Sequence, residues 1–394
     1  MTHRLLRKGK IFGQVLVSYL SMLSIRSKSI YVFGSWKGNK FSDNPKYLYL
    51  EALRDDSLTP VWITRNPAIL RTLRSQGYRV YMHNSIKGLY YQLRASVYFT
   101  CMSKEDVLSS VMGNATRINL WHGVAFKKIL YDDTVTRKKY SKKGVKADIW
   151  RALTYLPARK EYIVSTSDRI TEIYTSAFRT KREKILQLGQ PRNDIFFDDR
   201  LEVDSIALQQ GEKTLILYMP THRNEGKKQM LIGDIIDLDR INRFCDENNA
   251  VFVLKKHYYH KHETEDLARY SNIIDITSQE FDAQHLLKCA DVLITDYSSC
   301  FIDYLLLDRP VIFYNYDYDD YLQNDRDIYF DYDSTTPGVK AKTFEQLIAS
   351  LQAIVQRGND IFGEERKRVR NLFYSPGNQQ TVGRKILDYV KDNF

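Results

Sequence analysis

The sequence predicts an α/β fold made of two doubly wound, Rossmann-like domains. Short apolar runs of strand length alternate with segments of helical pattern along most of the chain, as in βαβ units with parallel sheets. With 394 residues the chain exceeds what one hydrophobic core usually serves. A polar stretch that follows Asp194 and ends at Lys213 divides the strand series in two and is interpreted as a linker.

The first series of predicted strands comprises Ser29–Phe33, Thr59–Ile63, Tyr78–Met82, Ala95–Thr100, Ile118–Trp121 and Tyr162–Ser165. The second series comprises Thr214–Tyr218, Ala250–Leu254, Ile273–Asp275, Val292–Thr295 and Val311–Tyr314. We therefore expect one domain over residues 29–200 and another over 211–375, facing each other across a cleft. Residues 376–394 are predicted to form a closing helix.

The charge balance suggests an anionic partner. Lys and Arg number 59 and Asp and Glu number 48, so the net charge is +11. A membrane surface, a phosphorylated substrate or nucleic acid would each fit this excess, which could also serve solubility alone. Nothing in the chain matches a nucleic-acid motif, and we expect no nucleic-acid partner.

Residues 1–28 form a basic amphipathic segment. It superficially resembles a signal peptide, but serines interrupt its apolar part and no small-residue cleavage site follows. No apolar run approaches the roughly 18 to 20 residues of a spanning helix. A helix lying on an anionic leaflet fits the pattern, and so does an ordinary helix packed on its own domain.

A second basic segment covers residues 127–160. It holds eleven Lys/Arg and three Asp, interleaved with aromatic and leucine side chains. Lys127, Lys128 and Trp150 are its candidate contacts to a membrane or to a lipid pyrophosphate. The alternative is a solvated loop and helix with ordinary surface charge.

Polar clusters follow five of the predicted strands. They are Trp121-His122-Gly123, Pro220 to Arg223, Lys255-Lys256-His257, Asp296 to Ser299, and Asp317 to Arg326. In open α/β sheets ligands bind beyond the carboxyl ends of the strands, so we expect one site assembled from both halves of the chain. The His, Lys, Arg and Ser content favours a phosphate-bearing ligand.

His122 is the candidate general base, because imidazole exchanges protons near neutral pH and a glycine follows that permits close backbone approach. A lone histidine is more often structural, which remains the alternative.

The other candidates point to a diphosphate. Asp296, Ser298 and Ser299 open a predicted helix at Phe301–Leu307 and could bind phosphate there, or could simply cap it. Lys256 and His257 would stabilise a pyrophosphate. Thr221, Arg223 and Arg326 complete this set, arginine being suited to bidentate phosphate binding.

Several chemistries lack their signatures. The chain has no GxxxxGK[ST], GxGxxG or GxSxG motif. Its four cysteines are scattered, and His257, His260 and His262 do not match a metal-binding spacing. We therefore expect neither a metal nor another cofactor; the acidic Asp317–Asp320 and Asp331–Asp333 are better explained by surface charge or ribose contacts.

Taken together, the motifs resemble the CDP-glycerol glycerophosphotransferase family of wall teichoic acid synthesis. The resemblance spans about residues 29–385, and the order and spacing of its motifs are specific. The matching positions are Trp121-His122-Gly123 with Lys127-Lys128, Gly189 with Pro191 to Asp194, Pro220-Thr221 with Arg223, His257, Thr295 to Ser299 with Asp303-Tyr304, Arg326, and Pro337-Gly338.

The resemblance implies a GT-B-like arrangement with an amino-terminal acceptor domain and a carboxy-terminal CDP-glycerol domain. It implies an undecaprenyl-pyrophosphate-linked saccharide as acceptor and a peripheral location on the cytoplasmic face of the cell membrane. His122 would be the base and His257 the second essential histidine, while Ser298, Ser299 and Arg326 would hold the donor diphosphate. Protein cations would replace a metal ion.

His222, which precedes Arg223, departs from the family pattern, and its role is open. The short chain favours the priming enzyme, which adds one glycerol phosphate to a disaccharide lipid. The alternatives are a poly(glycerol phosphate) or poly(ribitol phosphate) polymerase for teichoic acid or capsule, a GT-B nucleotide-sugar glycosyltransferase, and a non-enzymatic basic module that binds polyanions.

Overall fold

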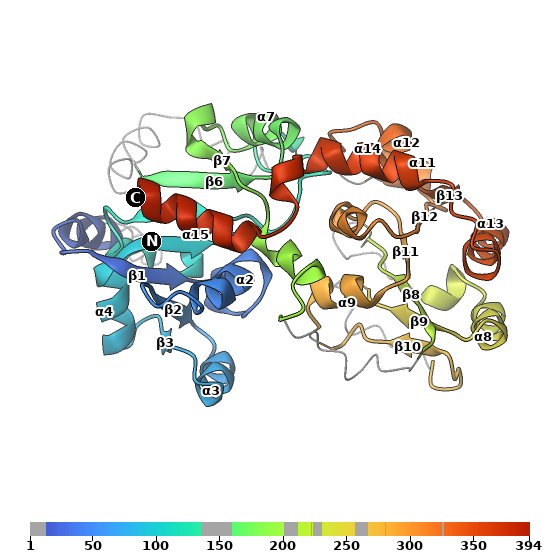
Figure 1. Ribbon diagram of the computed structural model, residues 1–394, viewed down its shortest axis with the longest axis horizontal. Coiled ribbons are helices and arrows are strands. Elements are labelled where there is room, and N and C mark those ends of the chain that lie inside the picture. The colour runs from blue at the N-terminus through green and yellow to red at the C-terminus, as the bar shows by residue number, and fades with distance from the viewer. Residues whose placement is uncertain are drawn as a thin grey trace, which may run out of the picture. The chain divides into compact units, whose positions relative to one another are not determined.

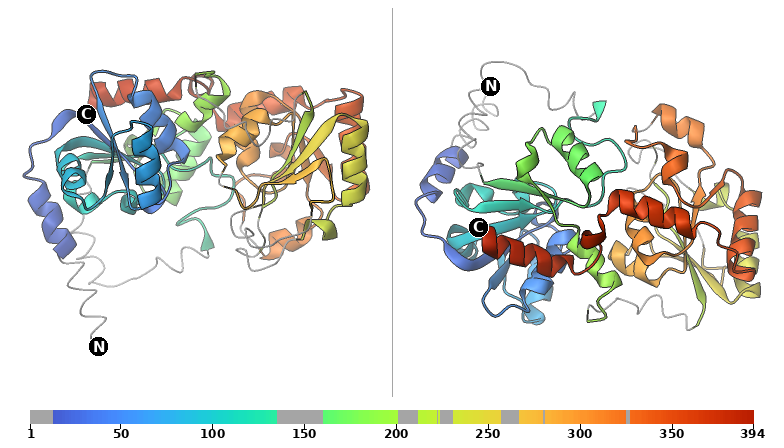
Figure 2. Two further views of the ribbon diagram at one scale, coloured as in Figure 1. Left: turned by 90° about the horizontal axis from the view of Figure 1, so that it is seen from below. Right: turned by 45° about the horizontal axis from the view of Figure 1, so that its top comes forward.

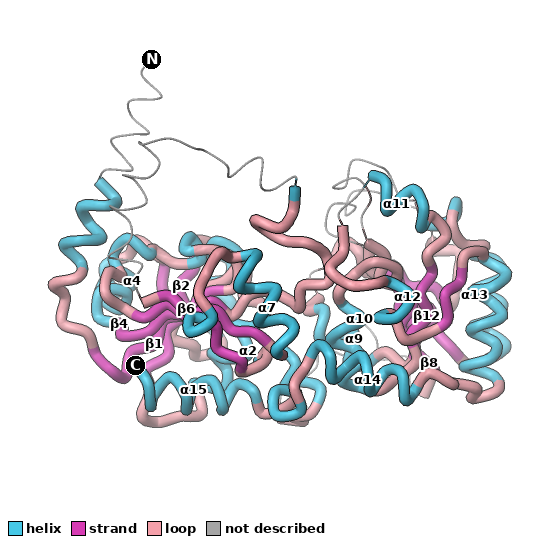
Figure 3. The backbone as a smooth tube through the Cα atoms, turned by 90° about the horizontal axis from the view of Figure 1, so that it is seen from above, coloured by secondary structure: helices cyan, strands magenta, loops and turns pink. Residues whose placement is uncertain are grey.

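The computed structural model describes residues 13–134, 160–200, 212–221, 223, 231–256, 267–279, 281–324 and 327–394. The chain divides into two compact units, each with one parallel sheet. Unit 1 consists of Met1–His122, Thr134–Asp194 and Gly377–Phe394, and unit 2 of Gly123–Asp133 and Ile195–Pro376. In both, helices flank the strands (Figure 3).

The sheet of unit 1 has the order β3-β2-β1-β4-β5-β6-β7, and each neighbouring pair is parallel (Figure 1). Its strands are β1 (Ser27–Phe33), β2 (Thr59–Thr64), β3 (Val80–Met82), β4 (Ala95–Thr100), β5 (Thr116–Asn119), β6 (Glu161–Ser165) and β7 (Ile185–Gln187). The helices are α2 (Asp43–Ala52), α3 (Pro67–Ser75), α4 (Ile86–Arg94), α7 (Asp168–Ala177) and α15 (Val382–Asn393).

Both faces of this sheet are buried. Tyr31 and Phe33 of β1 belong to one apolar cluster, with residues from α2, α3 and α15, while Ile30 and Val32 belong to a second cluster that α4 covers. Successive strand side chains point to opposite faces, so a strand that alternates between two clusters must be covered on both sides. Helices on both faces of the sheets are visible in Figure 2.

Unit 2 repeats this architecture with the order β10-β9-β8-β11-β12-β13, again parallel throughout. The strands are β8 (Thr214–Tyr218), β9 (Ala250–Leu254), β10 (Ile273–Asp275), β11 (Val292–Thr295), β12 (Val311–Tyr314) and β13 (Val339–Ala341). The helices are α8 (Leu238–Glu247), α9 (Ala283–Cys289), α10 (Cys300–Tyr304), α11 (Tyr318–Asn324), α12 (Tyr332–Thr335), α13 (Phe344–Leu351) and α14 (Gly363–Phe373). Residues of α8 and α13 complete the apolar cluster on one face.

The prediction of two parallel, doubly wound domains is confirmed. The five strands expected in unit 2 occur at the expected residues, whereas the three-residue edge strands β7 and β13 were not predicted. The helix expected at Phe301–Leu307 is instead the short α10 followed by a 3₁₀ turn at Leu305–Leu307. The strand expected at Ile118–Trp121 ends at Asn119, so Trp121 lies in the loop beyond it.

The units are not contiguous in sequence, and this differs from the expected boundaries of 29–200 and 211–375. Residues 123–133 belong to unit 2, and the chain returns to unit 1 at Gly377. The returning helix α15 contributes Val382, Ile386 and Leu387 to the core that it shares with α2. The apolar face of α15 therefore determines that the helix packs on unit 1. There it covers an apolar cluster that residues before 200 leave partly uncovered.

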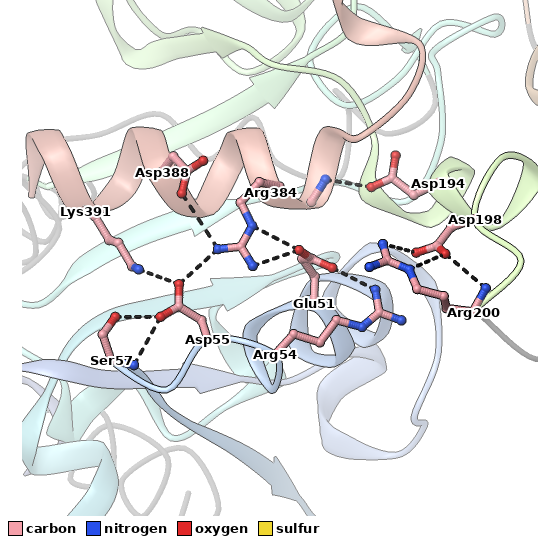
Figure 4. A network of polar contacts seen from close by, with 11 residues as sticks. Glu51, Arg54, Asp55, Ser57, Asp194, Asp198, Arg200, Arg384, Asp388 and Lys391 are labelled. Atoms are coloured by element: carbon pink, nitrogen blue, oxygen red, sulfur yellow. Dashed lines mark hydrogen bonds and ion pairs between the residues drawn. The ribbon is translucent and has the colours of Figure 1, made fainter.

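Polar contacts fix α15 at both ends (Figure 4). The Asp194 carboxylate accepts hydrogen bonds from the backbone N–H groups of Val382 (2.8 Å) and Gly383 (2.7 Å), which are otherwise unpaired at a helix start. Farther along, Arg384 pairs with Glu51 (3.0 Å) and Asp55 (3.0 Å). Lys391 also donates to Asp55.

Gly189 lets the returning segment approach closely. Its φ is +103°, and an added Cβ would lie 2.8 Å from the Asn378 carbonyl oxygen and 2.9 Å from a Val382 methyl carbon. No other residue type tolerates both this backbone conformation and this contact.

The N-terminal segment is helical over residues 13–21 where it is described, and residues 1–12 lie outside the described part. Arg26 anchors it to unit 1 by donating to the carbonyl groups of Ser21 (2.8 Å), Gln92 (3.0 Å) and Leu93 (2.6 Å). The segment is shorter than the expected 1–28, because Ser27 already begins β1. Among the helices of the described residues, none has the length and apolar character needed to cross a membrane.

The contact between Asp55 and α15 predicts a pH dependence. Hydrogen bonds from Lys391 and Ser57 hold the pKa of Asp55 well below its usual range, against the opposing effect of burial. A carboxylate whose pKa is depressed in the folded state stabilises the fold at pH values above its unfolded pKa of about 4. This stabilisation is lost progressively as the pH falls below that value. We expect amides of residues 382–393 to exchange hydrogen faster in Asp55→Asn than in the unchanged protein at pH 7, with the difference shrinking below about pH 4.

Hydrogen exchange read by mass spectrometry, with both proteins compared at each pH, measures this difference. The exposed neighbour Asp56 supplies the matched control, and Asp56→Asn should exchange like the unchanged protein at every pH. Equal exchange of Asp55→Asn and the unchanged protein at pH 7 would contradict the role given to this carboxylate.

Candidate active site

In unit 1 the candidate site is built on the loops that follow β4 and β5. These strands are neighbours in the parallel sheet, so Cys101 and His122, which come after them, lie at the same edge. The Nδ1 atom of His122 is 3.1 Å from the Cys101 carbonyl oxygen. A carbonyl oxygen only accepts hydrogen bonds, so Nδ1 carries the proton and the lone pair of the neutral ring is on Nε2.

The backbone beside His122 has an uncommon conformation. Trp121 has a φ of +57° and Gly123 a φ of +147°. A bulky residue in the left-handed region is disfavoured and persists only where surrounding contacts hold it. The Asn44 side chain provides such contacts, since its Nδ2 donates to the carbonyl oxygens of Trp121 (2.9 Å) and Leu120 (3.3 Å).

Arg192 reaches the same loop. Its Nη1 donates to the His122 carbonyl oxygen (3.1 Å) and to Asp43 Oδ1 (3.0 Å), and its backbone N–H donates to Asn44 Oδ1 (3.1 Å). Two indole rings flank the imidazole, with centroid distances of 4.2 Å for Trp121 and 5.7 Å for Trp36. In unit 1, therefore, His122 is fixed in place while no described residue hydrogen-bonds its Nε2.

In unit 2 the candidate residues follow β9, β8, β11 and β12, which are adjacent in the sheet. Its centre is Arg223, which is buried. The guanidinium donates to Asp317 through Nε (2.6 Å) and Nη2 (3.0 Å), to Asp296 Oδ2 (2.9 Å), and to the Thr221 carbonyl oxygen (2.6 Å). Most of its N–H groups are thus committed to protein acceptors.

Burial opposes the charge on Arg223, but the carboxylates of Asp296 and Asp317 more than offset this and raise its pKa. The guanidinium also lies over the rings of Tyr297 (5.1 Å) and Tyr321 (5.3 Å), which stack on each other with centroids 3.7 Å apart. Removing one partner of such a buried pair typically costs about 3 to 5 kcal/mol. The network therefore holds the loops after β8, β11 and β12 together.

Tyr297 belongs to the same network. Burial, and then the charges of Asp317 and Asp296, raise the pKa of its phenol well above the usual value, so it stays protonated. Its hydroxyl lies 3.2 Å from Asp317 Oδ1 and donates to it.

The hydroxyl groups predicted to bind a phosphate surround this network. Thr221 is buried, its N–H donates to Asp296 Oδ1 (2.9 Å), and its Oγ1 has no hydrogen-bond partner in the described part of the chain. Ser298 and Ser299 are half-buried, and the N–H of Cys300 donates to Ser298 Oγ (3.4 Å). Lys256 is buried after β9, where its N–H donates to Thr277 Oγ1 (3.0 Å).

Lys127 and Lys128 lie in unit 2, not in the unit that carries His122. Lys127 pairs with Ile328 through an antiparallel bridge, and its Nζ lies 5.1 Å from the ring centroid of Tyr321. Lys128 Nζ pairs with Asp327 (3.1 Å). This differs from the expected placement in the acceptor domain, because strand pairing with residues 327–329 draws the loop into unit 2.

The remaining predicted residues cannot be placed. His257, Arg326, Trp150 and the unexplained His222 lie outside the described residues, as do residues 135–159 of the basic segment. No set of three His, Cys, Asp or Glu side chains suited to a metal ion occurs among the residues that are described.

The contributors that were not predicted from the sequence include Asn44, the Cys101 carbonyl and the Arg223–Asp317 pair. Asn44 carried a signal only as part of a helix start, since Ser42-Asp43-Asn44 is typical of a capping sequence. The other two depend on which strands are neighbours.

Comparison with known proteins decides the family. The model of the CDP-glycerol:poly(glycerophosphate) glycerophosphotransferase family matches residues 16–391. The chain belongs to this family. The expected resemblance is confirmed, and the chain is a transferase of teichoic acid biosynthesis with a GT-B-like fold.

Two curated relatives cover most of the chain. It is 27% identical to the teichoic acid glycerol-phosphate transferase of Staphylococcus aureus, over 93% of each chain. It is 29% identical to a teichoic acid poly(glycerol phosphate) polymerase of Bacillus spizizenii, over 83% of this chain and 84% of the relative. The solved structure of the wall teichoic acid polymerase TagF superimposes with a TM-score of 0.74 at 26% identity, covering 100% of this chain and 98% of that one.

Proposed function

We propose that this protein transfers glycerol phosphate from CDP-glycerol to an undecaprenyl-pyrophosphate-linked saccharide, in the priming step of wall teichoic acid synthesis. The supporting observation is the fixed imidazole of His122, whose Nδ1 is held by the Cys101 carbonyl while Nε2 has no partner among the described residues. A neutral imidazole with an open Nε2 can accept a proton. The S. aureus relative named for glycerol-phosphate transfer matches nearly the full chain.

In the proposed reaction, His122 Nε2 takes the proton of an acceptor hydroxyl. The hydroxyl oxygen forms a bond to the phosphorus that carries the glycerol, and the bond from that phosphorus to the CMP oxygen breaks. Lys256, Ser298 and Ser299 would stabilise charge on the transferred group and on CMP. His257 and Arg326 keep the roles that the family resemblance implies for them.

Arg223 and Asp296 act differently in this proposal from the direct donor contacts expected from the sequence. Their hydrogen bonds to each other and to Thr221 leave them little capacity for a diphosphate. They would instead hold Thr221 and the serine loop in the geometry that binds it. Thr221 Oγ1, which is buried and unpartnered within the described residues, is the candidate donor to a ligand oxygen.

Polymerisation is the second candidate function. The B. spizizenii relative is named as a poly(glycerol phosphate) polymerase and matches 83% of this chain. The same site would serve if the growing chain end could re-enter as the acceptor.

The reaction is tested with a defined lipid-linked disaccharide and each CDP-polyol supplied separately. We expect CMP release with CDP-glycerol, a product heavier by one glycerol phosphate, and undiminished turnover in EDTA. A series of products that differ by one glycerol phosphate each would show that the protein is a polymerase and not a priming enzyme. Use of CDP-ribitol or of a UDP-sugar in place of CDP-glycerol, or complete loss of turnover in EDTA, would contradict the corresponding part of the proposal.

Substitution of His122 tests its role as base. His122→Ala should lower kcat by about 10²-fold or more, the usual effect of losing a general base, while CDP-glycerol binding measured by calorimetry is retained. His83 supplies the control. It follows the edge strand β3, which three strands separate from β5 in the sheet, so His83→Ala should retain kcat. Near-normal turnover of His122→Ala would remove it from the mechanism.

We further propose that unit 1 contacts the cytoplasmic membrane face through its N-terminal helix and the turn that follows it, residues 13–24. Leu20 is 58% exposed and Leu23 82%, although the segment is tied to the unit through Arg26. Exposed leucine side chains on a basic protein are suited to binding an anionic bilayer surface.

The double substitution Leu20→Glu/Leu23→Glu should reduce co-sedimentation with phosphatidylglycerol vesicles by about tenfold, because two apolar contacts are lost and two negative charges are gained. Ile361, which is 77% exposed in unit 2, supplies the control Ile361→Glu, which should bind as before. Unchanged vesicle binding of the double variant would rule out this surface.

A further inference from the structure

We propose that Arg192 and Asn44 are positioning residues for His122. Asp106 in turn orients the Cys101 carbonyl group, which determines which nitrogen of the His122 ring carries the proton. This inference rests on the proposed role of His122 as base. It adds the residues that hold the imidazole in its proton-accepting form, none of which needs to contact a substrate.

The first device acts on the ring. The Asp106 carboxylate is buried and accepts backbone hydrogen bonds from Lys37 (2.8 Å), Cys101 (2.9 Å) and Met102 (2.8 Å). It thereby joins the loop after β1 to the loop after β4. The peptide groups on either side of Cys101 are fixed, and its carbonyl oxygen faces His122 Nδ1.

The second device acts on the backbone. Asn44 is fully buried and uses both ends of its amide, since Nδ2 donates to the Trp121 and Leu120 carbonyl groups and Oδ1 accepts from Arg192 N–H. The Arg192 guanidinium then donates to the next carbonyl group along the chain, that of His122. Three successive carbonyl groups are therefore held by two side chains.

This bonding explains how Trp121 keeps a positive φ. Without donors on both sides, the Trp121–His122 peptide would relax toward ordinary dihedral angles, and the ring would move away from the Cys101 carbonyl oxygen. A water molecule could then hydrogen-bond either nitrogen, and the ring would populate both tautomers. In the second tautomer Nε2 carries the proton and cannot act as a base.

The consequence for catalysis is specific. Loss of a positioning residue should leave CDP-glycerol binding intact, because other residues bind that substrate. It should lower the fraction of enzyme in which the lone pair of His122 Nε2 is correctly placed. Small displacements of a reacting group, and a wrong tautomer above all, reduce turnover strongly. We expect Arg192→Ala to lower kcat by roughly 10- to 100-fold with a nearly unchanged KM for CDP-glycerol.

The test combines kinetics with ¹⁵N NMR of protein labelled at histidine, in which the His122 signals are identified by their loss in His122→Ala. In the unchanged protein the ring should be protonated on Nδ1 alone at a pH where it is neutral. Arg192→Ala should show a substantial Nε2–H population and a lower kcat. Arg192→Lys retains a cationic donor and should lie between the two in both measurements.

Arg384→Ala is the matched control for loss of stability. Arg384 pairs with Glu51, Asp55 and Asp388 in the same unit, none of which belongs to the His122 loop, so its removal should lower the melting temperature while leaving the His122 tautomer and kcat unchanged. If Arg192→Ala does not fold, the partial tautomer shift of Arg192→Lys decides the question.

Two results would overturn the inference. One is an Arg192→Ala protein with the same tautomer and kcat as the unchanged protein. The other is a fall in kcat with an unchanged tautomer, which would mean that Arg192 acts structurally or on a substrate. Full activity of His122→Ala would instead refute the proposed base, and the NMR result would still show whether Arg192 positions the ring.

Discussion

Parallel pairing of neighbouring strands is the constraint on which the chemistry of each unit depends. It places all carboxyl ends of a sheet at one edge, so residues far apart in sequence become hydrogen-bonding partners. Asp106, Cys101 and His122 meet because β4 and β5 are adjacent. Arg223, Asp296 and Asp317 meet because β8, β11 and β12 are adjacent. A change in strand order would separate each set, even with every residue unchanged.

The two hydrogen-bonded networks show how differently a protein can use a polar side chain. Arg223 has an acceptor for most of its N–H groups, and its charge is balanced by two carboxylates, so it serves order more than ligand binding. His122 has Nδ1 held by the Cys101 carbonyl oxygen, while Nε2 has no hydrogen-bond partner in the part of the chain that the structure describes. Fully satisfied polar groups make loops rigid, whereas a group with a remaining lone pair on such a loop can react.

Most strands were predictable, because burial on both faces of a parallel sheet leaves a continuous apolar signal. The three-residue edge strands β7 (Ile-Leu-Gln) and β13 (Val-Lys-Ala) were missed because each includes a polar residue in so short a run, although the equally short β3 and β10 were found. His122 and the Asp296–Ser299 loop could be identified as candidates because a strand end is a local pattern. The pairing of Arg223 with Asp317, and the hold of Asn44 on Trp121, could not be, since both depend on which strands become neighbours.

The return of α15 to unit 1 has a consequence for biosynthesis. Val382, Ile386 and Leu387 complete a core otherwise built from the first 200 residues. While the ribosome is still making unit 2, the nascent amino-terminal sheet therefore exposes the apolar surface of α2 that this helix will cover. That surface stays uncovered until α15 has been synthesised, so closure of the first core must follow the synthesis of unit 2.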